Sequence, residues 1–515
     1  MRTGLIILGV AAGLRLAACA QTVYTVDTGR RHQRIDNFGA SDCWTAQVFG
    51  RFPDARREQL ADWLFSMAVG TNGRPQGIGL SLWRFNVGAG SAEQGDASGI
   101  KDPYRRTECF QRPDGTYDWT RQAGQRWFLQ AAKKRGVPRF LAFCNSAPVQ
   151  MAANGLANNR GRPKDGTYNL KPGGEIAFAD FLATVIGAME KREGIRFDVV
   201  SPFNEPEWNW DAPNQEGSPA LTGEIARMVR VLDRTLSEHG LPAKILVTEA
   251  GKIDDLFQSG TALKGRDNQI EALFSPASPQ SIAGLPHVPP VVAGHSYWTT
   301  APEQGLLAKR QALRAKLDAY RLGYWQTEVC VMSNDREIGG GGKRDLGMKA
   351  ALYVARVVHH DLCVAEASAW HWWLAMTASD YKDGLIYVTP NADRTDGAIA
   401  DSKLLWTLGN FSRFIRPGAV RVGVRAPQAD VNDPAGLMVS AYVNEQERSV
   451  VCVMVNYADR VQPVRLEVAG VGVGAFLPYL TSDASGDDIK PQPAVMPHAR
   501  YDVPARAVVT WVGRY

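Results

Sequence analysis

The sequence alternates short apolar runs with longer amphipathic stretches along most of its length. Eight runs rich in β-branched or aromatic residues predict strands, at residues 34–41, 80–87, 139–146, 196–205, 244–250, 291–298, 323–329 and 367–374. The stretches between them, such as 178–194 and 222–240, predict helices, and several end in Gly after basic residues. Eight nearly continuously apolar strands that alternate with helices favour an α/β fold, the closed (β/α)8 TIM barrel, over an open sheet.

The pattern changes after about residue 415. Strand-like runs then follow at short intervals, separated by turn-rich stretches such as 427–436, and no helical pattern intervenes. We therefore predict an appended all-β domain, a sandwich, at residues 415–515. Residues 22–30 also predict a strand, so we expect 21–34 to join the sandwich and the barrel to span 35–414.

Residues 1–20 predict a targeting signal. Arg2 precedes an apolar run at 5–14 that is too short to span a bilayer. The small residues before Gln21 fit a secretory cleavage site, while the sequence LAAC, which ends at Cys19, resembles a lipoprotein box in which that cysteine is lipidated. We expect an exported protein, periplasmic, secreted or an outer-membrane lipoprotein, with a lipid anchor as its only link to a membrane.

Charge and cysteine spacing exclude several classes of function. The 58 basic and 53 acidic residues are spread without a polybasic block, so we expect no nucleic-acid partner. The cysteines stand singly, without a C-x-x-C pair, which argues against a metal site built from thiolates. The patterns G-x-S-x-G and H-E-x-x-H are absent. We therefore expect no metal and no cofactor.

Polar and aromatic residues gather at the predicted strand ends, where a barrel builds its active site. Cleavage of a glycosidic bond needs one protonated and one ionised carboxyl group. Glu205 on the fourth strand and Glu328 on the seventh lie across the predicted barrel mouth, and Glu249 on the fifth is the weaker candidate. A lone glutamate at a strand end is more often paired with an arginine, but the pair, with Asn204 and tryptophans beside it, favours catalysis.

Motifs along the whole chain then resemble a known family. The sequences RIDNFGAS, LSLWRFNVGAG, CNSAP, HSYW, WQTEV and GNFSRFIRPG stand in this order, with NEP closing the fourth strand. Together they resemble glycoside hydrolase family 30, and most closely its endo-β-1,6-galactanase-like branch. The resemblance runs from about residue 22 to the end.

The resemblance implies a role for several residues. Glu205 would be the acid/base and Glu328 the nucleophile of a retaining double displacement, with Asn204 at the sugar 2-hydroxyl and Arg84 beside Glu328. His295 would bind the sugar or position Glu328. Val149 and Gln150 replace the aromatic residues usual in the family, so one stacking platform is missing or comes from elsewhere. The other expected substrate contacts are Asp42, Asn86, Asn145, Trp208, Tyr297, Trp298 and Trp372.

The resulting expectation is an exported retaining glycosidase that acts on a β-linked polysaccharide or oligosaccharide, with endo-β-1,6-galactanase as first choice. Another β-glycosidase of the family stays open: a β-1,6-glucanase, a xylanase, a β-fucosidase or a glucosidase. A non-catalytic glycan-binding protein would be expected to have lost one carboxylate, and both are present.

Overall fold

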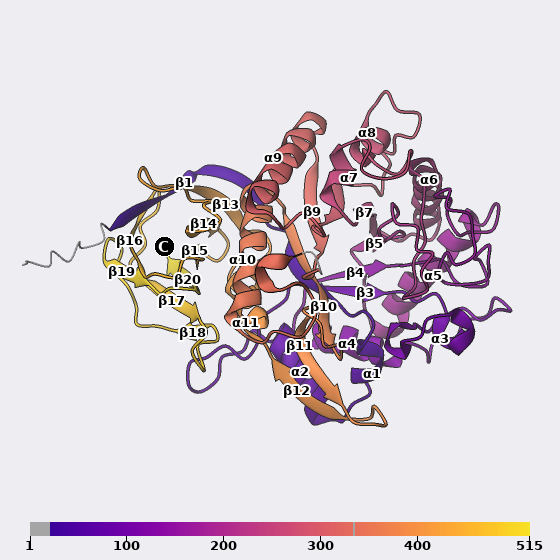
Figure 1. The fold of residues 1–515 in the computed structure, drawn as a ribbon, viewed down its shortest axis with the longest axis horizontal. Coiled ribbons are helices and arrows are strands. Elements are labelled where there is room, and N and C mark those ends of the chain that lie inside the picture. The colour runs from indigo at the N-terminus through magenta and orange to yellow at the C-terminus, as the bar shows by residue number, and fades with distance from the viewer. Residues whose placement is uncertain (1–20, 333–334) are drawn as a thin grey trace, which may run out of the picture.

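The computed structural model describes residues 21–332 and 335–515, which form two sheets (Figure 1). The predicted targeting segment and Cys19 lie outside the described residues. In Figure 1 the first sheet, with its helices, occupies the right and the second sheet the left, and helices α10 and α11 lie between them. No helix in the described part of the chain is long and apolar enough to cross a membrane.

The first sheet is the predicted parallel barrel. Its strands follow the order β6-β5-β4-β3-β2-β10-β9-β8-β7. The two strands at the ends of this order come from the single predicted strand 244–250, and backbone bonds from Leu246 to Val200 and from Ala293 to Val247 close the ring there. The bounds are β2 Asn37–Ser41, β3 Leu82–Asn86, β4 Arg139–Phe143, β5 Val199–Ser201, β6 Lys244–Ile245, β7 Thr248–Ala250, β8 Val291–His295, β9 Gly323–Glu328 and β10 Ala369–Thr377. Each predicted barrel strand is therefore confirmed.

Helices surround the barrel. The predicted helices at 178–194 and 222–240 are α5 (Glu175–Glu193) and α6 (Thr222–Glu238), and Gly194 ends α5 with a φ of 63°. The other long helices are α2 (Asp54–Phe65), α4 (Ala123–Lys134), α9 (Glu303–Tyr320), α10 (Met348–Cys363) and α11 (Lys403–Ser412). Shorter ones are α1 (Ala46–Phe49), α3 (Ser91–Gln94), α7 (Ile253–Phe257), α8 (Gln269–Phe274) and the 3-10 turns η1 (Gly95–Ser98), η2 (Pro103–Arg105) and η3 (Arg336–Ile338). A hairpin, β11 (Gly384–Pro390) and β12 (Gly397–Asp401), extends the sheet beside β10.

The fourth barrel strand is shorter than predicted. The sequence predicted that it would run through Glu205 and end at Pro206, but β5 stops at Ser201. The next residue, Pro202, has no N–H to donate to a neighbouring strand, so the strand ends before it. Asn204 and Glu205 therefore lie on the loop that follows β5.

The second sheet has nine strands in the order β18-β17-β20-β15-β14-β13-β1-β16-β19. Strand β1 pairs with β13 on one side and with β16 on the other. Tyr501 of β19 packs on Trp511 of β20 at 5.2 Å between ring centroids, so the sheet folds over on itself around its own core. The bounds are β1 Thr22–Arg34, β13 Val420–Arg425, β14 Leu437–Asn444, β15 Ser449–Asn456, β16 Gln462–Ala469, β17 Phe476–Thr481, β18 Lys490–Pro491, β19 Arg500–Val503 and β20 Ala507–Arg514.

Asn410 bonds α11 to the second sheet. Its Nδ2 donates to the carbonyl of Tyr479 at 3.1 Å, and its Oδ1 accepts from the hydroxyl of Thr481 at 2.6 Å. The hydroxyl of Thr510 donates to the backbone carbonyl of Asn410 at 2.7 Å. Because Asn410 is fully buried, these bonds satisfy polar groups that would otherwise be costly in the interface.

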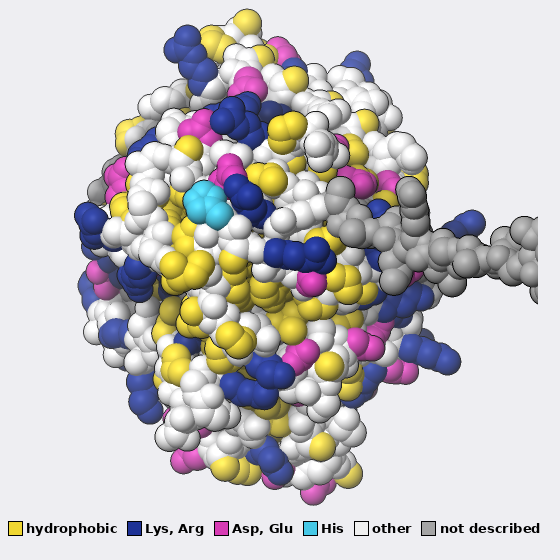
Figure 2. Space-filling model, turned by 90° about the vertical axis from the view of Figure 1, so that its left-hand side faces the viewer, with side chains coloured by type: hydrophobic (Ala, Val, Ile, Leu, Met, Phe, Trp, Pro, Cys, Tyr) yellow, Lys and Arg dark blue, Asp and Glu magenta, His cyan; other side chains and the backbone are white. Residues whose placement is uncertain are grey.

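The face of the second sheet that points away from the barrel carries many apolar side chains, which gather near its middle in Figure 2. Exposed members of the second sheet and its loops are Val461, Leu477 and Met496. Six described cysteines are free thiols, and all but Cys363 are buried.

Candidate active site

A cavity of about 590 Å³ opens at the C-terminal ends of the barrel strands. Its walls come from β10 and from loops that follow β2, β3, β5, β8, β9 and β10. The lining residues that matter most below are Trp44, Glu205, Trp208, Trp298, Glu328 and Trp373. This is the end of the barrel at which the sequence predicted a site.

Glu205 is held in the cavity wall by bonds to its own backbone. Its φ is 46°, in the left-handed region that residues other than glycine rarely adopt. The backbone N–H of Glu205 donates to the carbonyl of Glu249 at 2.8 Å, and Nε1 of Trp210 donates to the carbonyl of Glu205 at 2.9 Å. These two bonds hold the strained loop in place, and the carboxyl group faces the cavity.

Glu328, the last residue of β9, is held by charge-assisted bonds. Arg84 Nη1 donates to its Oε2 at 2.6 Å, and the hydroxyl of Tyr297 donates to its Oε1 at 2.9 Å. Arg84 is fully buried and donates from Nη2 to Oδ1 of Asn204 at 3.1 Å. The carboxylate of Glu328 is therefore oriented by a cation and by a hydroxyl.

The two carboxyl groups lie close together. One oxygen of Glu205, one oxygen of Glu328 and one ring nitrogen of His295 all fall within 4.8 Å of one another. Retaining glycosidases place their two carboxyl groups about 5 to 5.5 Å apart, while inverting ones need about 6.5 to 9.5 Å to fit a water molecule. The separation found in this cavity is of the shorter kind.

His295, at the end of β8, contacts both Glu205 and Glu249 and is fully buried. Its Nδ1 is 3.0 Å from Oε1 of Glu205, and its Nε2 is 3.2 Å from Oε2 of Glu249. Burial disfavours the charged ring, but the charge of Glu328 and the bonds to Glu205 and Glu249 outweigh it and raise the pKa of His295 to about 10. The ring is therefore a cation at neutral pH and donates from both nitrogens.

Glu249 is buried away from the cavity and stays ionised. The hydroxyl of Ser201 donates to it at 2.6 Å, the hydroxyl of Thr327 donates to its other oxygen, and Arg84 Nη2 lies 3.7 Å away. Burial alone would raise the pKa of Glu249, but the bond from His295 and the charge of Arg84 outweigh it and lower this pKa to about 2. Glu249 therefore balances the charges of Arg84 and His295.

The surroundings of Glu205 shift its pKa in the opposite direction from that of Glu249. Burial raises its pKa above the ordinary value, the bond and charge of His295 partly counter this, and the charge of Glu328 raises the pKa further. A carboxyl group with a raised pKa can hold the proton that a leaving oxygen needs. The geometry thus provides one carboxyl group that favours its neutral form beside one that is paired with a guanidinium.

The sequence reasoning missed Glu207, a second buried acid behind Glu205. Its Oε1 accepts from the backbone N–H of Gly251. A Cβ at Gly251 would lie 2.8 Å from this oxygen and 3.0 Å from the carboxyl carbon of Glu205, so only glycine fits between the two acids. Burial first, and then the charges of Asp255 and Glu205, raise the pKa of Glu207 to about 8. The sequence feature that could have identified Glu207 is its position two residues after Glu205, in the sequence NEPE.

Aromatic side chains form opposite walls of the cavity. Trp208 is 42% exposed and meets Trp298 edge to face at 5.2 Å. On the other wall Trp44, which follows β2, meets Trp373 at 5.2 Å and 88°. The sequence reasoning did not select Trp44 as a site residue, although it closely follows a predicted strand. Val149 and Gln150 do not line the cavity.

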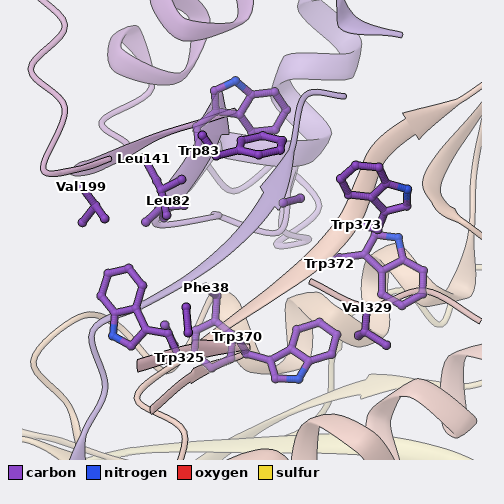
Figure 3. Close-up of a cluster of buried hydrophobic side chains, with 14 of the residues drawn as sticks. Phe38, Leu82, Trp83, Leu141, Val199, Trp325, Val329, Trp370, Trp372 and Trp373 are labelled. Atoms are coloured by element: carbon purple, nitrogen blue, oxygen red, sulfur yellow. The ribbon is translucent and has the colours of Figure 1, made fainter. Parts of the chain in front are cut away.

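Trp372 is not a cavity residue, contrary to the prediction. It is fully buried, it stacks on Trp370 at 6.3 Å, and its Nε1 donates to the carbonyl of Asp383 at 2.8 Å. Successive residues of a strand point to opposite faces, and Trp373 rather than Trp372 lines the cavity. Figure 3 shows these tryptophans along the same strand, β10, within the buried cluster of the barrel.

Three further predicted contacts also lie beneath the cavity instead of at its edge. Asp42 is 1% exposed, and its carboxylate accepts from the backbone N–H of Asn86 at 2.8 Å and from Nε2 of Gln125 at 3.0 Å. Asn145 donates to the side chain of Asn86 at 3.3 Å. These residues form a buried polar network between β2, β3 and β4, and it supports the loops from below.

Of the remaining predicted residues, Trp208, Tyr297 and Trp298 line the cavity with Glu205 and Glu328. Arg84, Asn204 and His295 are buried behind the two carboxyl groups and contact them or one another.

The only described group of side chains that could converge on a metal ion is Glu205, His295 and Glu328. His295 is protonated at neutral pH, and the guanidinium of Arg84 already binds Glu328. A cation would have to displace both positive charges, so this arrangement fits a proton and a sugar better than a metal.

Comparisons with known proteins agree with this geometry. Residues 21–387 match the model of O-glycosyl hydrolase family 30. The chain is 28% identical over 255 residues to the endo-beta-1,6-galactanase of Hypocrea rufa (46% of this chain, 51% of that protein). It is 21% identical over 331 residues to the glucuronoxylanase XynC of Bacillus subtilis (64% of each). The chain thus spans between about half and two thirds of the length of these two relatives.

Among solved structures, a conserved exported protein from Bacteroides fragilis is 34% identical with a TM-score of 0.88. The match covers 95% of this chain and 100% of that one.

Proposed function

Because the chain belongs to O-glycosyl hydrolase family 30 and is a glycosidase, we propose that it cleaves β-linked glycans with retention of configuration. Glu205 is the acid/base and Glu328 the nucleophile. The observation that carries this assignment is that one oxygen of Glu205 and one oxygen of Glu328 lie within 4.8 Å of each other, while the two carboxyl groups have opposed electrostatic settings.

The first step joins Glu328 to the sugar. Its carboxylate attacks the anomeric carbon, the bond from that carbon to the glycosidic oxygen breaks, and Glu205 gives its proton to the departing oxygen. Arg84 and Tyr297 hold the attacking carboxylate in one orientation. Arg84 also engages Oδ1 of Asn204, which leaves the amide nitrogen of Asn204 to donate to the sugar 2-hydroxyl.

The second step uses Glu205 as a base. The covalent bond to the sugar removes the negative charge of Glu328, and that charge is one of the causes of the raised pKa of Glu205. The pKa of Glu205 therefore falls in the intermediate, and the ionised carboxylate takes a proton from the water that attacks the anomeric carbon. The bond from that carbon to the carboxyl oxygen of Glu328 breaks in the same step, which releases the sugar and restores the carboxylate of Glu328. His295 stays bonded to Glu205 through both steps and, together with Glu249, fixes its position.

The substrate we propose first is a β-1,6-galactan, cut within the chain. The support is the relative named endo-beta-1,6-galactanase together with a cavity whose two walls carry tryptophans. Flat indole faces suit the C–H faces of sugars. Because another relative is a glucuronoxylanase, a xylan is the alternative substrate to a β-1,6-galactan. Further candidate substrates are a β-1,6-glucan, a β-fucoside and a β-glucoside.

We also propose that the protein is exported. The support is the charged and apolar pattern of residues 1–20 and the likeness to a Bacteroides fragilis protein that is described as exported. Lipid attachment at Cys19 would hold the protein at a membrane, and cleavage before Gln21 would release it.

Glu328→Ala tests the mechanism. The variant should lose hydrolysis, and sodium azide should restore it in part and give the glycosyl azide of opposite anomeric configuration, observed by NMR. The exposed Glu445→Ala is the matched control and should keep native activity. An inverted product from the native enzyme, or azide products of unchanged configuration, would overturn the retaining assignment.

A panel of β-1,6-galacto-, β-1,6-gluco- and β-1,4-xylo-oligosaccharides tests the substrate. We expect the galacto-oligosaccharides to be cleaved fastest and to yield several product lengths. Release of single sugars only would contradict cleavage within the chain.

A further inference from the structure

Two buried residues behind the acid/base, Glu207 and Gly251, have no part in the mechanism above. Glu207 is 8% exposed and does not line the cavity, so its side chain does not reach a bound glycan. It stands two residues after Glu205, and Gly251 directly follows β7. Whatever Glu207 does for the reaction must therefore act through Glu205.

Two hydrogen bonds connect the loop of Glu205 to the end of β7. The backbone N–H of Glu205 donates to the carbonyl of Glu249 at 2.8 Å. In the other direction, the backbone N–H of Gly251 donates to Oε1 of Glu207. The loop is thus bonded to the same short segment, residues 249–251, both at the acid/base and two residues later.

Gly251 lies against the carboxyl group of Glu205. A Cβ at Gly251 would be 3.0 Å from both Cδ and Oε1 of Glu205, and 2.8 Å from Oε1 of Glu207. Contacts this short leave no space for a side chain, so the backbone of Gly251 packs directly on the carboxyl group. Nδ1 of His295 donates to the same Oε1 of Glu205 at 3.0 Å. The carboxyl group is therefore held by a ring and by a stretch of backbone.

These contacts determine which oxygen of Glu205 holds the proton. His295 is a cation at neutral pH and donates to Oε1, so the acid hydrogen of neutral Glu205 lies on Oε2. The last torsion of a glutamate side chain is broad and roughly twofold, so by itself it would not hold Oε2 in one direction. Gly251, which packs on Cδ and Oε1, restricts this rotation. Misplacing a catalytic group by about 1 Å can cost about 10²-fold in rate, so the restriction matters for proton transfer.

Glu207 suits this position because it is mostly neutral at pH 7. Burial first, and then the charges of Asp255 and Glu205, raise its pKa to about 8. Its Oε2 is buried without a hydrogen-bond partner among the described residues, which is less costly for a neutral acid than for a carboxylate. A neutral carboxyl group anchors Gly251 without adding a negative charge beside Glu205.

We propose that Glu207 is a positioning residue for the acid/base, and that it acts by holding the backbone of Gly251 against the carboxyl group of Glu205. The inference rests on the proposed function, because Glu205 needs a fixed proton only if it is the acid of a glycosidase. It also requires an uncharged hydrogen-bond acceptor at residue 207, which glutamine supplies as well as a neutral glutamate does.

Three variants test this role. Glu207→Leu removes the acceptor at similar size, Glu207→Gln keeps a neutral acceptor, and Gly251→Ala places a methyl group against the carboxyl group of Glu205. The controls are Glu190→Leu, at an exposed position of α5, and Gly472→Ala, where a Cβ would meet no atom within 4 Å. Thermal unfolding shows which variants are folded. Gly251→Ala carries the test if Glu207→Leu is not folded, because the Cβ meets movable ends of side chains there and not backbone.

Two probes that differ only in the leaving group separate positioning from general damage to the cavity. One is the oligosaccharide that the native enzyme cleaves fastest, and the other is the 2,4-dinitrophenyl glycoside of the same glycone. The dinitrophenyl group leaves without a proton, so kcat/KM on this probe reports the attack of Glu328 and not the acid.

On the oligosaccharide, kcat/KM should fall about 10- to 100-fold in Glu207→Leu and in Gly251→Ala, because the proton is no longer held in place. On the dinitrophenyl probe the same two variants should stay within about threefold of native, and Glu207→Gln should do so on both probes.

Equal losses on the two probes would show damage to the cavity and would overturn the positioning role. So would Glu207→Leu and Gly251→Ala within about twofold of native on the oligosaccharide, or a loss in Glu207→Gln as large as that in Glu207→Leu. Each of these outcomes leaves the proposed function in place. Failure of the native enzyme to cleave any glycan of the panel would overturn the proposed function as well.

Discussion

His295 bonds Glu205 through one ring nitrogen, at 3.0 Å, and Glu249 through the other, at 3.2 Å. One imidazolium thus contacts a carboxyl group that faces the cavity and a carboxylate that is buried behind it. The protonation of Glu205 depends on this contact, which determines the direction of the first two predictions.

The first prediction concerns Glu205 itself. In the native enzyme kcat/KM should fall as pH rises through the raised pKa of Glu205, because the acid form is then lost. Glu205→Gln should reduce kcat/KM on oligosaccharides by about 10² to 10⁴. It should spare substrates with a 2,4-dinitrophenyl leaving group, which need no proton. The pH–rate profile of Glu205→Gln should lack the alkaline limb, which is the fall of kcat/KM as pH rises. A Glu205→Gln profile with an unchanged alkaline limb would show that another group is the acid.

The second prediction concerns Glu249. Glu249→Gln removes one of the carboxylates that raise the pKa of His295, so this pKa falls from about 10 and the ring loses its charge at a lower pH than in the native enzyme. The positive charge that lowers the pKa of Glu205 is then weakened, and the alkaline limb of kcat/KM should move to higher pH while kcat decreases. Glu303→Gln, at a more exposed position on α9, is the control and should not change the pH of the alkaline limb. A shift to lower pH would contradict the charge relation between His295 and Glu205.

Arg84→Met should destabilise the fold in a pH-dependent way. Arg84 is the fully buried cation beside Glu328 and Glu249, and its loss leaves buried carboxylates unbalanced, at a cost of about 3 to 5 kcal/mol at pH 7. Loss of the guanidinium removes one of the charges that hold the pKa of Glu249 at about 2, so this carboxyl group takes up a proton more readily in the folded variant than in the folded native protein. Lowering the pH should therefore reduce the deficit relative to the native protein.

Urea unfolding of the two proteins at pH 7 and pH 5 measures this deficit. Arg31→Met, at the exposed pair with Glu445, is the control and should cost less than about 1 kcal/mol. A deficit that grows on acidification would show that Arg84 does not balance the carboxylates.

The contact of α10 with the second sheet should weaken in acid. His359 is buried there, and its Nε2 lies 2.9 Å from Oδ1 of Asn432. Burial, which outweighs the bond to Asn432, lowers the pKa of His359 to about 4. Between about pH 6.5 and pH 4 the unfolded histidine takes up a proton and the folded one does not, so stability falls as pH falls, by up to about 3 kcal/mol.

His359→Gln tests this, because glutamine keeps a donor for Asn432 and does not titrate. Its stability should depend less on pH between 7 and 4 than that of the native protein, by urea unfolding. The more exposed His239→Gln is the control and should follow the native curve. Parallel curves for His359→Gln and the native protein would contradict the prediction.

The barrel could be predicted from the sequence because its strands are apolar on both faces and its helices have clear ends. Because these strands are buried on both faces, the sequence does not show which aromatic residues at the strand ends face the cavity. In β10 every residue is buried, so no polar alternation showed that Trp373 faces the cavity and Trp372 does not. Pro202 indicates where β5 ends. The prediction instead placed the end of the strand in the NEP motif, at Glu205, four residues after Ser201.

The carboxyl groups of Glu205 and Glu328 could be predicted from the sequence, but the contacts of the buried residues around them could not. Glu205, on the loop after β5, and Glu328, at the end of β9, stand in recognisable motifs, whereas the setting of Asp42 depends on Gln125, 83 residues away in the chain. Contacts at that separation leave no local pattern. The role of Glu249 likewise follows from its contacts with His295 and Arg84, which only the closed barrel creates.

Strand β1 has a consequence for how the protein is made. It leaves the ribosome long before its partner strands, yet Gln21, just before it, bonds Val464, 443 residues later. At about 5 to 20 residues per second, the partner strand β16 emerges roughly 20 to 90 s after β1. During synthesis β1 therefore exposes two unpaired edges, the kind of surface that invites aggregation. A chain cut short before β13 would keep both edges open, so premature termination should yield insoluble fragments even where the barrel is complete.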